Sequence, residues 1–446
     1  MKIKDSKVLV YGLGKSGIGA AGLLLKHGAD VYLFDANKDL NIEKIKSETD
    51  ESVKVFVGEL PIEIISQLDF VVVSPGVPLD SPDILKIYEH DVNIYGEIEL
   101  AYSCSKGDIL AITGTNGKTT TTTLLGEIIK EYNENTFVVG NIGNPYTSVA
   151  DETTSNSSIV AEISSFQLET IKEFRPMVSA ILNITPDHLD RHHTMEAYSK
   201  AKFKITENQI KDDFCILNYD DEIIKLKAAD VKAKIVYFSS SKELISGVFI
   251  KDSRIILKYA GEYTEVCNLD ELQILGLHNY ENVMAAVAMA YVYGVPVELI
   301  AKVVKEFKGV EHRIEYVTEK DGVQYYNDSK GTNPDAAMKA VGAMKRPTVL
   351  IAGGYDKGSS YKEWIQGFSD VVKTLVLVGE TKYHIKSDAL SVGFPNDIIM
   401  AETFEEAVHK ASEYAEKATV SCCLRHVKVG ICDQITKQEE IYSRKL

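Results

Sequence analysis

The sequence predicts an α/β protein of several domains built on parallel sheets. The chain has 446 residues, which is too long for one hydrophobic core of ordinary size. Short apolar runs alternate with helical stretches along it, and this alternation favours parallel strands connected by helices. Two of the apolar runs lead into glycine-rich loops. Together these observations predict three α/β domains, over residues 1–98, 99–309 and 310–446.

The first domain opens with the pattern of a Rossmann-like nucleotide site. The apolar residues 8–11 precede the glycine-rich loop 12–17, and a helical stretch follows. The next apolar run ends on Asp35, at the spacing of the dinucleotide fingerprint, about 20 residues past the glycines. Lys15 and Ser16 lie in the loop. Because any nucleotide diphosphate suits such a loop, the pattern favours a pyrophosphate and does not specify NAD.

A second strand-loop-helix unit follows the apolar residues 109–112. Its loop has the residue types of a P-loop, in which consecutive N–H groups surround phosphate oxygens, a lysine approaches the β and γ groups, and a threonine hydroxyl reaches Mg²⁺. A turn that only caps a helix is the alternative. The pattern therefore predicts a central ATPase domain of the P-loop type. The candidate ATP-binding residues are Gly114, Thr115, Asn116, Gly117, Lys118, Thr119 and Thr120.

The last domain shows the same alternation from about Tyr316 onward, including the apolar run 348–352, which predicts a second Rossmann-like domain. The net charge of −16 opposes a general nucleic-acid or anionic-membrane surface, since both require clustered Lys and Arg. No long apolar run or signal-like segment is present. We expect a cytoplasmic monomer that binds neither nucleic acid nor membranes.

Three further motifs carry a family resemblance. Residues 140–143 read GNIG, residues 162–168 read EISSFQL, and residues 183–191 read NITPDHLDR. Together with the P-loop variant, they resemble the Mur ligases, which form amide bonds at the expense of ATP in peptidoglycan precursor synthesis. The resemblance implies that the three domains bind a UDP-linked substrate, ATP and an amino acid, in that order.

The resemblance also implies a two-metal catalytic centre. Glu162 closes an apolar run, where a carboxylate can complete an Mg²⁺ shell with Thr119, although it could instead cap the next turn. By the resemblance, His188 and Lys202 hold a second Mg²⁺, with Lys202 carbamylated by CO₂. A lysine beside two cations is disfavoured as an ammonium, whereas its carbamate is an anion. With Lys118, these residues are the catalytic candidates.

Other candidates come from matching positions. Asn279 and Asn282 begin a helix expected to contact the nucleotide, with plain helix capping as the alternative. Arg313 is placed near the ATP phosphates and Asp328 at the ribose. The implied substrate-binding residues are Lys15, Ser16, Asp35, Asn141, Lys330, Thr332 and Lys357.

Residues 355–358 (YDKG) resemble the D-glutamate-adding members of the family, in which the lysine pairs with a carboxylate of the amino acid. The implied reaction adds D-glutamate to UDP-N-acetylmuramoyl-L-alanine. The substrate carboxylate attacks the γ-phosphorus of ATP, and the amine then attacks the acyl phosphate. The alternatives are another Mur-type or folylpolyglutamate-type ligase and a non-catalytic nucleotide-binding homologue.

The tail from about residue 421 is atypical. Residues 421–427 (SCCLRHV) do not match the family pattern, but codons regrouped one base earlier permit a family-like segment. We hypothesise a frameshift beginning near Ser421, which would remove a substrate-contacting serine and the last helix of the family.

Overall fold

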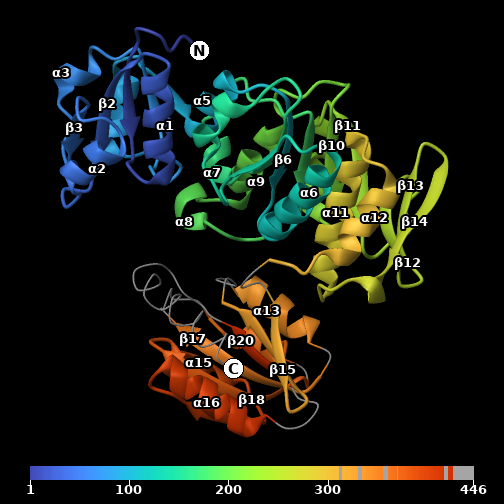
Figure 1. Ribbon diagram of the computed structural model, residues 1–446. Helices are drawn as coiled ribbons and strands as arrows, with labels where there is room; N and C mark the ends of the chain where they lie inside the picture. Colours follow the sequence, from blue (N-terminus) through green and yellow to red (C-terminus); the bar gives the residue numbers. More distant parts are fainter. Residues whose placement is uncertain are drawn as a thin grey trace. The chain divides into compact units, whose positions relative to one another are not determined.

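The computed structural model describes residues 1–310, 314–329, 334–344, 346–354, 360–368, 370–415 and 420–424. The described backbone forms three sheets flanked by helices, which confirms the predicted α/β class (Figure 1). The chain divides into two compact units. The first unit comprises Met1–Leu269 and Glu281–Lys305, and the second comprises Asp270–Tyr280 and Glu306–Leu446. The first two sheets lie in the first unit.

The first sheet is parallel, with strand order β3-β2-β1-β4-β5. The chain continues from β1 to one side and returns with β4 on the other, so the carboxyl ends of β1 and β4 form a topological switch point, where ligands bind in such sheets. The strands are β1 (Lys7–Tyr11), β2 (Asp30–Asp35), β3 (Lys54–Val57), β4 (Phe70–Val73) and β5 (Asn93–Gly96). The helices are α1 (Lys15–Lys26), α2 (Ile42–Glu48), α3 (Ile62–Ile65) and α4 (Pro82–Glu89).

The central sheet has the order β14-β13-β12-β11-β10-β9-β6-β8-β7. Its strands from β7 to β12 are parallel, and β12, β13 and β14 form an antiparallel edge. The parallel strands are β6 (Asp108–Thr113), β7 (Thr136–Gly140), β8 (Ser158–Glu162), β9 (Val178–Ile181), β10 (Phe214–Asn218), β11 (Lys234–Ser239) and β12 (Gly247–Lys251). The edge continues with β13 (Arg254–Tyr259) and β14 (Glu262–Asn268).

Helices surround this sheet on both faces. The α-helices are α5 (Glu97–Cys104), α6 (Lys118–Tyr132), α7 (Ser165–Leu168), α8 (Leu189–His192), α9 (Met195–Phe203), α10 (Glu222–Lys227), α11 (Leu277–Tyr293) and α12 (Val297–Glu306). Short 3₁₀ turns are η1 (Tyr146–Ser148), η2 (Ala150–Glu152), η3 (Lys204–Thr206), η4 (Ala228–Asp230) and η5 (Leu269–Glu271).

The first and central sheets share one hydrophobic core. A single buried cluster contains Val8 and Leu24 of the first sheet and its helix together with Ile109 and Leu217 of the central sheet. The connecting helix α5 is anchored by Glu99, whose buried carboxylate accepts backbone N–H bonds from three consecutive residues, 172–174, at 2.8 to 3.1 Å. Side chains from both sheets can therefore build a common site.

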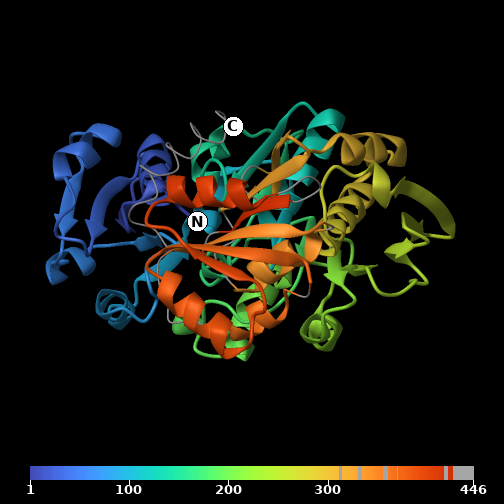
Figure 2. The ribbon, with the colours of Figure 1, turned by 90° about the horizontal axis from the view of Figure 1, so that it is seen from below.

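The third sheet has the order β15-β16-β20-β17-β18-β19 and is parallel except for the β15–β16 pair. The last described strand, β20, lies between β16 and β17. Helices α13 to α15 pack on one face and α16 on the other (Figure 2). The strands are β15 (Glu315–Lys320), β16 (Val323–Asp328), β17 (Thr348–Gly354), β18 (Val372–Gly379), β19 (Asp397–Met400) and β20 (Val420–Leu424). The helices are α13 (Pro334–Ala343), α14 (Lys362–Gln366), α15 (Lys382–Ser391) and α16 (Phe404–Tyr414).

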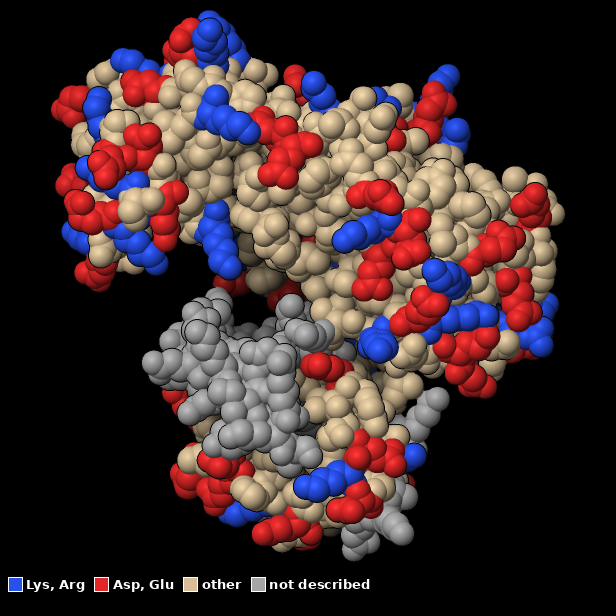
Figure 3. Space-filling view, viewed as in Figure 1, with Lys and Arg blue, Asp and Glu red and all other residues tan. Residues whose placement is uncertain are grey.

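The surface of the first unit is mixed in charge. Figure 3 shows acidic and basic side chains interspersed over the visible face of this unit. Within the described part of the chain, every helix is too short or too polar to cross a membrane.

Candidate active site

The glycine-rich loop 114–117 follows β6, whose neighbours in the sheet are β8 and β9. Gly117 has φ +85° and is the N-cap of α6. A side chain there would be strained by the positive φ, and its Cβ atom would lie 2.1 Å from Oδ1 of Asn282 on α11, so the Asn282 side chain would have to move. The first N–H groups of an α-helix have no acceptor within the helix, so the start of α6 can bind an anion. Thr119 and Thr120 are buried in this first turn.

Part of the loop is held by Asn183, just beyond β9. The N–H of Thr115 donates to the Asn183 carbonyl oxygen at 2.9 Å, and the N–H of Asn116 donates to Oδ1 of Asn183 at 2.8 Å. Asn183 donates back to the Asn116 carbonyl at 3.0 Å. Two amides that the sequence pattern assigns to phosphate thus fix the shape of the loop in this structure.

Glu162 ends β8 and is buried, with 1% of its surface exposed. Its Oε1 atom accepts a hydrogen bond from Nδ2 of Asn141 at 2.8 Å. Its Oε2 atom is also buried and has no hydrogen-bond partner among the described residues. A buried carboxylate oxygen without a partner destabilises the fold. Such an atom is therefore typical of a position that binds a ligand or a cation.

Lys118 and Lys202 come together at the loop. Nζ of Lys118 donates to the carbonyl oxygens of Gly114 and Thr115, both at 2.9 Å. Nζ of Lys202 reaches the Gly114 carbonyl from α9 at 2.7 Å and lies 4.5 Å from the centre of the Tyr198 ring. Burial, and secondly the charge of Lys118, hold the pKa of Lys202 well below its usual range.

His188 begins α8 in the left-handed region, at φ +52°, with about half of its side chain exposed. Its ring packs edge-on against Phe166 at 4.9 Å between centroids. Loss of hydration lowers the pKa of His188, and the charges of Lys118 and Lys202 lower it further, against the opposing effect of Asp187. The neutral imidazole, which is the form that binds metals, is thereby favoured.

The candidates of the first domain lie at the carboxyl edge of the first sheet. Lys15 is exposed and Ser16 half-buried at the start of α1. Asp35 accepts one bond on each carboxylate oxygen, from the N–H groups of Leu13 and Asn37, both at 2.9 Å. The carboxylate of Asp35 therefore holds the glycine-rich loop through the N–H of Leu13.

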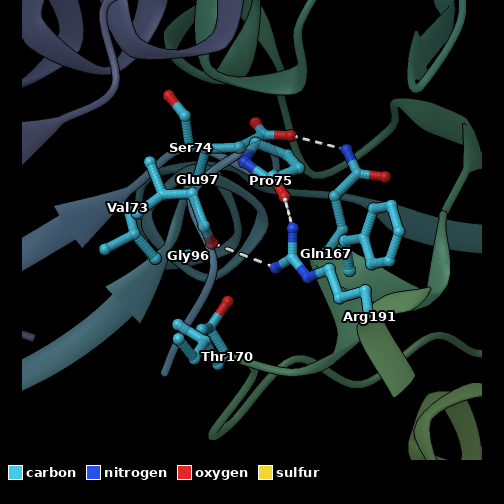
Figure 4. A pocket seen from close by; sticks show the side chains of 11 residues that line it. Val73, Ser74, Pro75, Gly96, Glu97, Gln167, Thr170 and Arg191 are labelled. Atoms are coloured by element: carbon cyan, nitrogen blue, oxygen red, sulfur yellow. Dashed lines mark hydrogen bonds between the residues drawn. The ribbon is translucent and has the colours of Figure 1, made fainter. Parts of the chain in front are cut away.

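A small pocket, partly open to solvent, lies between the first and central sheets. Ser74 and Pro75 line it from the loop after β4, and Glu97, Gln167 and Arg191 line it from α5, α7 and α8 (Figure 4). Nε2 of Gln167 donates to Oε1 of Glu97 at 2.7 Å. Burial raises the pKa of Glu97 to about 7. Gln167 and Arg191 lie in the motifs at 162–168 and 183–191, which do not single them out as site residues, and Glu97 lies outside these motifs.

The remaining candidates belong to other parts of the chain. In the second unit, Nδ2 of Asn279 donates to the Leu275 carbonyl at 2.7 Å, and the buried Asp328 accepts from the N–H of Ile314 at 3.0 Å. Arg313, Lys330, Thr332 and Lys357 lie outside the described residues, as does the tail beyond residue 424. Among the described residues, no group of three or more His, Cys, Asp and Glu side chains could by itself hold a metal ion.

Solved structures share this fold. The chain superimposes on UDP-N-acetylmuramate-alanine ligase MurC from Thermotoga maritima with a TM-score of 0.62, at 19% identity and over 99% of this chain and 100% of that one. It also superimposes on a MurF ligase from Thermotoga maritima in complex with ADP, with a TM-score of 0.61 at 16% identity, over 99% of this chain and 95% of that one.

Sequence comparison extends the match to family level. Three models match, those of the Mur ligase MurD-like N-terminal domain (residues 6–96), the Mur ligase middle domain (112–290) and the Mur ligase glutamate ligase domain (312–424). Two relatives named UDP-N-acetylmuramoylalanine–D-glutamate ligase are similar over most of their length. The one from Lachnoclostridium phytofermentans is 53% identical, over 93% of this chain and 92% of the relative. The one from Clostridioides difficile is 48% identical, over 94% and 93%. The chain belongs to the Mur ligase family.

Proposed function

We propose that this protein joins D-glutamate to UDP-N-acetylmuramoyl-L-alanine, with ATP converted to ADP and phosphate. The names of relatives that are about half identical over nearly their whole length support this substrate pair. The observation that carries the chemistry is the meeting of Lys118 and Lys202 on the Gly114 carbonyl, at the strand ends where Glu162 also lies.

ATP is assigned to the loop and helix start at residues 114–120. The N–H groups of the first turn of α6 can bind phosphate oxygens, and the side chain of Lys118 lies at the loop, where it can turn from the Gly114 carbonyl to the transferred phosphoryl group. Asn282 packs on the same loop. Asn279, Arg313 and Asp328 are assigned to the nucleotide by the resemblance.

The residues present fit Mg²⁺. The unpaired Oε2 of Glu162 and the hydroxyl of Thr119 are oxygen donors of the type that Mg²⁺ prefers, and His188 with a carbamate on Lys202 would complete a second site. Bound Mg²⁺ supplies charge compensation for the phosphoryl group that is transferred. The low pKa of Lys202 favours the neutral amine, whose lone pair adds to CO₂ and gives a carbamate and a proton.

The UDP-linked substrate is assigned to the edge of the first sheet, near Lys15, Ser16 and Asp35. Asn141, whose side-chain amide donates to Glu162, is assigned to the same substrate by the resemblance. Lys330, Thr332 and Lys357 are assigned to D-glutamate. The carboxylate attacks the γ-phosphorus and releases ADP, the amine of D-glutamate attacks the acyl carbonyl, and phosphate leaves as the amide forms. The protein positions these groups and compensates their charge.

The atypical tail bears on whether this chain is active. The match to the glutamate ligase domain ends at residue 424, the last residue of β20. The frameshift stays a hypothesis, and a non-catalytic homologue is the second candidate that this segment favours.

The experiment is phosphate release from ATP by the full chain, with UDP-N-acetylmuramoyl-L-alanine and D-glutamate supplied together and singly. The expected result is release only when both are present, and its loss in Lys118→Ala. Binding of ATP and of UDP-N-acetylmuramoyl-L-alanine without release of phosphate would favour the non-catalytic homologue. Release triggered by a different amino acid would contradict the assignment.

A further inference from the structure

Arg191 links the central sheet to the first sheet. From α8, its Nη1 donates to the Pro75 carbonyl at 2.8 Å (Figure 4), and its Nη2 donates to the Val77 carbonyl at 3.0 Å. Nη2 also lies 2.9 Å from Oε2 of Glu169. The side chain is 16% exposed. One guanidinium therefore holds the loop after β4 to the segment that follows α7.

The same side chain contacts Phe166, a neighbour of His188. The Arg191 guanidinium lies over the Phe166 ring, with 4.1 Å between its central carbon and the ring centre. Phe166 in turn packs edge-on against His188. The next residue, His192, is buried, with its Nε2 atom 3.0 Å from Oγ of Ser165. The turn that carries His188 is thus fixed on both α7 and the first sheet.

Only a guanidinium fits these contacts. It is planar, offers donors in a rigid fork and stacks on an aromatic ring, whereas a lysine ammonium is a single, strongly hydrated point. Because the site is largely shielded from water, hydrogen bonds from a charged donor are strong there and costly to lose. Lysine at position 191 cannot satisfy both carbonyl oxygens and the carboxylate while it covers Phe166.

We propose that Arg191 is a positioning residue that keeps the 74–77 loop and the His188 turn in one arrangement, and so sets the affinity for the UDP-linked substrate. The inference rests on the proposed function for the identity of that substrate. Arg191 itself is not proposed to contact the reacting atoms. The contacts of Arg191 are to the 74–77 loop, Glu169 and Phe166, whereas ATP is assigned to residues 114–120, so we expect the affinity for ATP to be independent of this link.

The test compares Arg191→Lys with Arg175→Lys in the full chain. Arg175 is a matched control, since it makes two hydrogen bonds to Asp213 in the same unit, both at 2.8 Å, away from the pocket. Hydrogen exchange of peptides covering residues 74–77 and 188–192 is measured without ligand. Binding of UDP-N-acetylmuramoyl-L-alanine and of ATP is measured by calorimetry.

In Arg191→Lys we expect faster exchange in both segments and substrate binding weakened about tenfold, which is the loss of one good interaction, with ATP affinity unchanged. Arg175→Lys should leave the exchange rates of both segments, the substrate affinity and the ATP affinity unchanged. Unchanged exchange in the two segments, or an equal loss of ATP affinity, would overturn the inference. If the unmodified chain does not bind the UDP-linked substrate, the proposed function fails, and the exchange result still decides whether Arg191 holds the two segments.

Discussion

The side-chain nitrogens of Lys118 and Lys202 donate to the same atom, the carbonyl oxygen of Gly114, at 2.9 and 2.7 Å. Two lysines this close disfavour two positive charges, and burial adds to the effect at Lys202, whose pKa is held well below its usual range. The neutral amine of Lys202 is therefore favoured at the loop that also binds the side chain of Lys118.

Lys202 is expected to carry a carbamate when CO₂ is present. With isotopically labelled bicarbonate, the unmodified chain should show a carbamate resonance in its NMR spectrum, and Lys202→Arg should not. We expect activity to fall at least about a hundredfold in Lys202→Arg, as for loss of a charge-stabilising group. Lys200→Arg is the control, since Lys200 is exposed on the same helix. The same resonance in Lys202→Arg would contradict the assignment.

Glu162→Gln should separate stability from metal binding. The variant keeps the side-chain oxygen that accepts from Asn141 and removes the negative charge of Glu162, whose Oε2 atom has no hydrogen-bond partner among the described residues. The free energy of unfolding of the ligand-free protein should therefore rise by about 1 kcal/mol. Binding of Mn²⁺ in the presence of ATP, followed by electron paramagnetic resonance, should be lost. Glu127→Gln, at an exposed position of α6, should change neither quantity. Retained Mn²⁺ binding in Glu162→Gln would remove Glu162 from the metal site.

Glu97 should make stability depend on pH. Burial raises its pKa from 4.5 to about 7, so the folded protein holds a proton that the unfolded chain releases at lower pH. Its contribution is most favourable below about pH 4.5 and is lost as the pH rises through 7. Glu97→Gln removes this dependence and should stabilise the protein by up to about 3 kcal/mol at pH 8, with a smaller difference at pH 5. Thermal unfolding at both pH values checks this, and an equal difference at the two values would count against it.

Glu99 should be needed for stability. Its carboxylate accepts the N–H groups of residues 172–174, and an amide can offer only one accepting oxygen. We expect Glu99→Gln to lower the free energy of unfolding by about 3 kcal/mol. Glu173→Gln changes an exposed carboxylate in the same segment and should have little effect. Equal melting temperatures of the two variants would show that the Glu99 carboxylate does not anchor α5.

Most of the correct predictions from sequence came from motifs formed by residues close together in the chain. The glycine loop around Lys118 and the pair formed by Asp35 and the first loop are specified by short spacings along the chain, so their strand ends could be placed from sequence. The family resemblance assigned Lys202 to the metal centre, but it did not predict the bond from Lys202 to the Gly114 carbonyl, since the two residues are 88 positions apart. The domain boundaries at residues 98 and 309 stay predictions.

The pocket between the first and central sheets could not be predicted from such local motifs. The Arg191 contacts to Pro75 and Val77 span 116 and 114 positions, and the Glu97–Gln167 bond spans 70. No local period or motif predicts which side chain of a charged loop turns toward a distant carbonyl oxygen. These contacts are set by the shared core of the two sheets, which becomes visible only once the chain is folded.

The most direct test of the account is the mass of the product formed by the full chain from ATP, UDP-N-acetylmuramoyl-L-alanine and an amino acid. The account predicts a product heavier by one glutamate residue with D-glutamate, and none with L-glutamate or L-lysine. Absence of that product with D-glutamate, although ATP and the UDP-linked substrate bind, would contradict the claim that this chain is a D-glutamate-adding ligase.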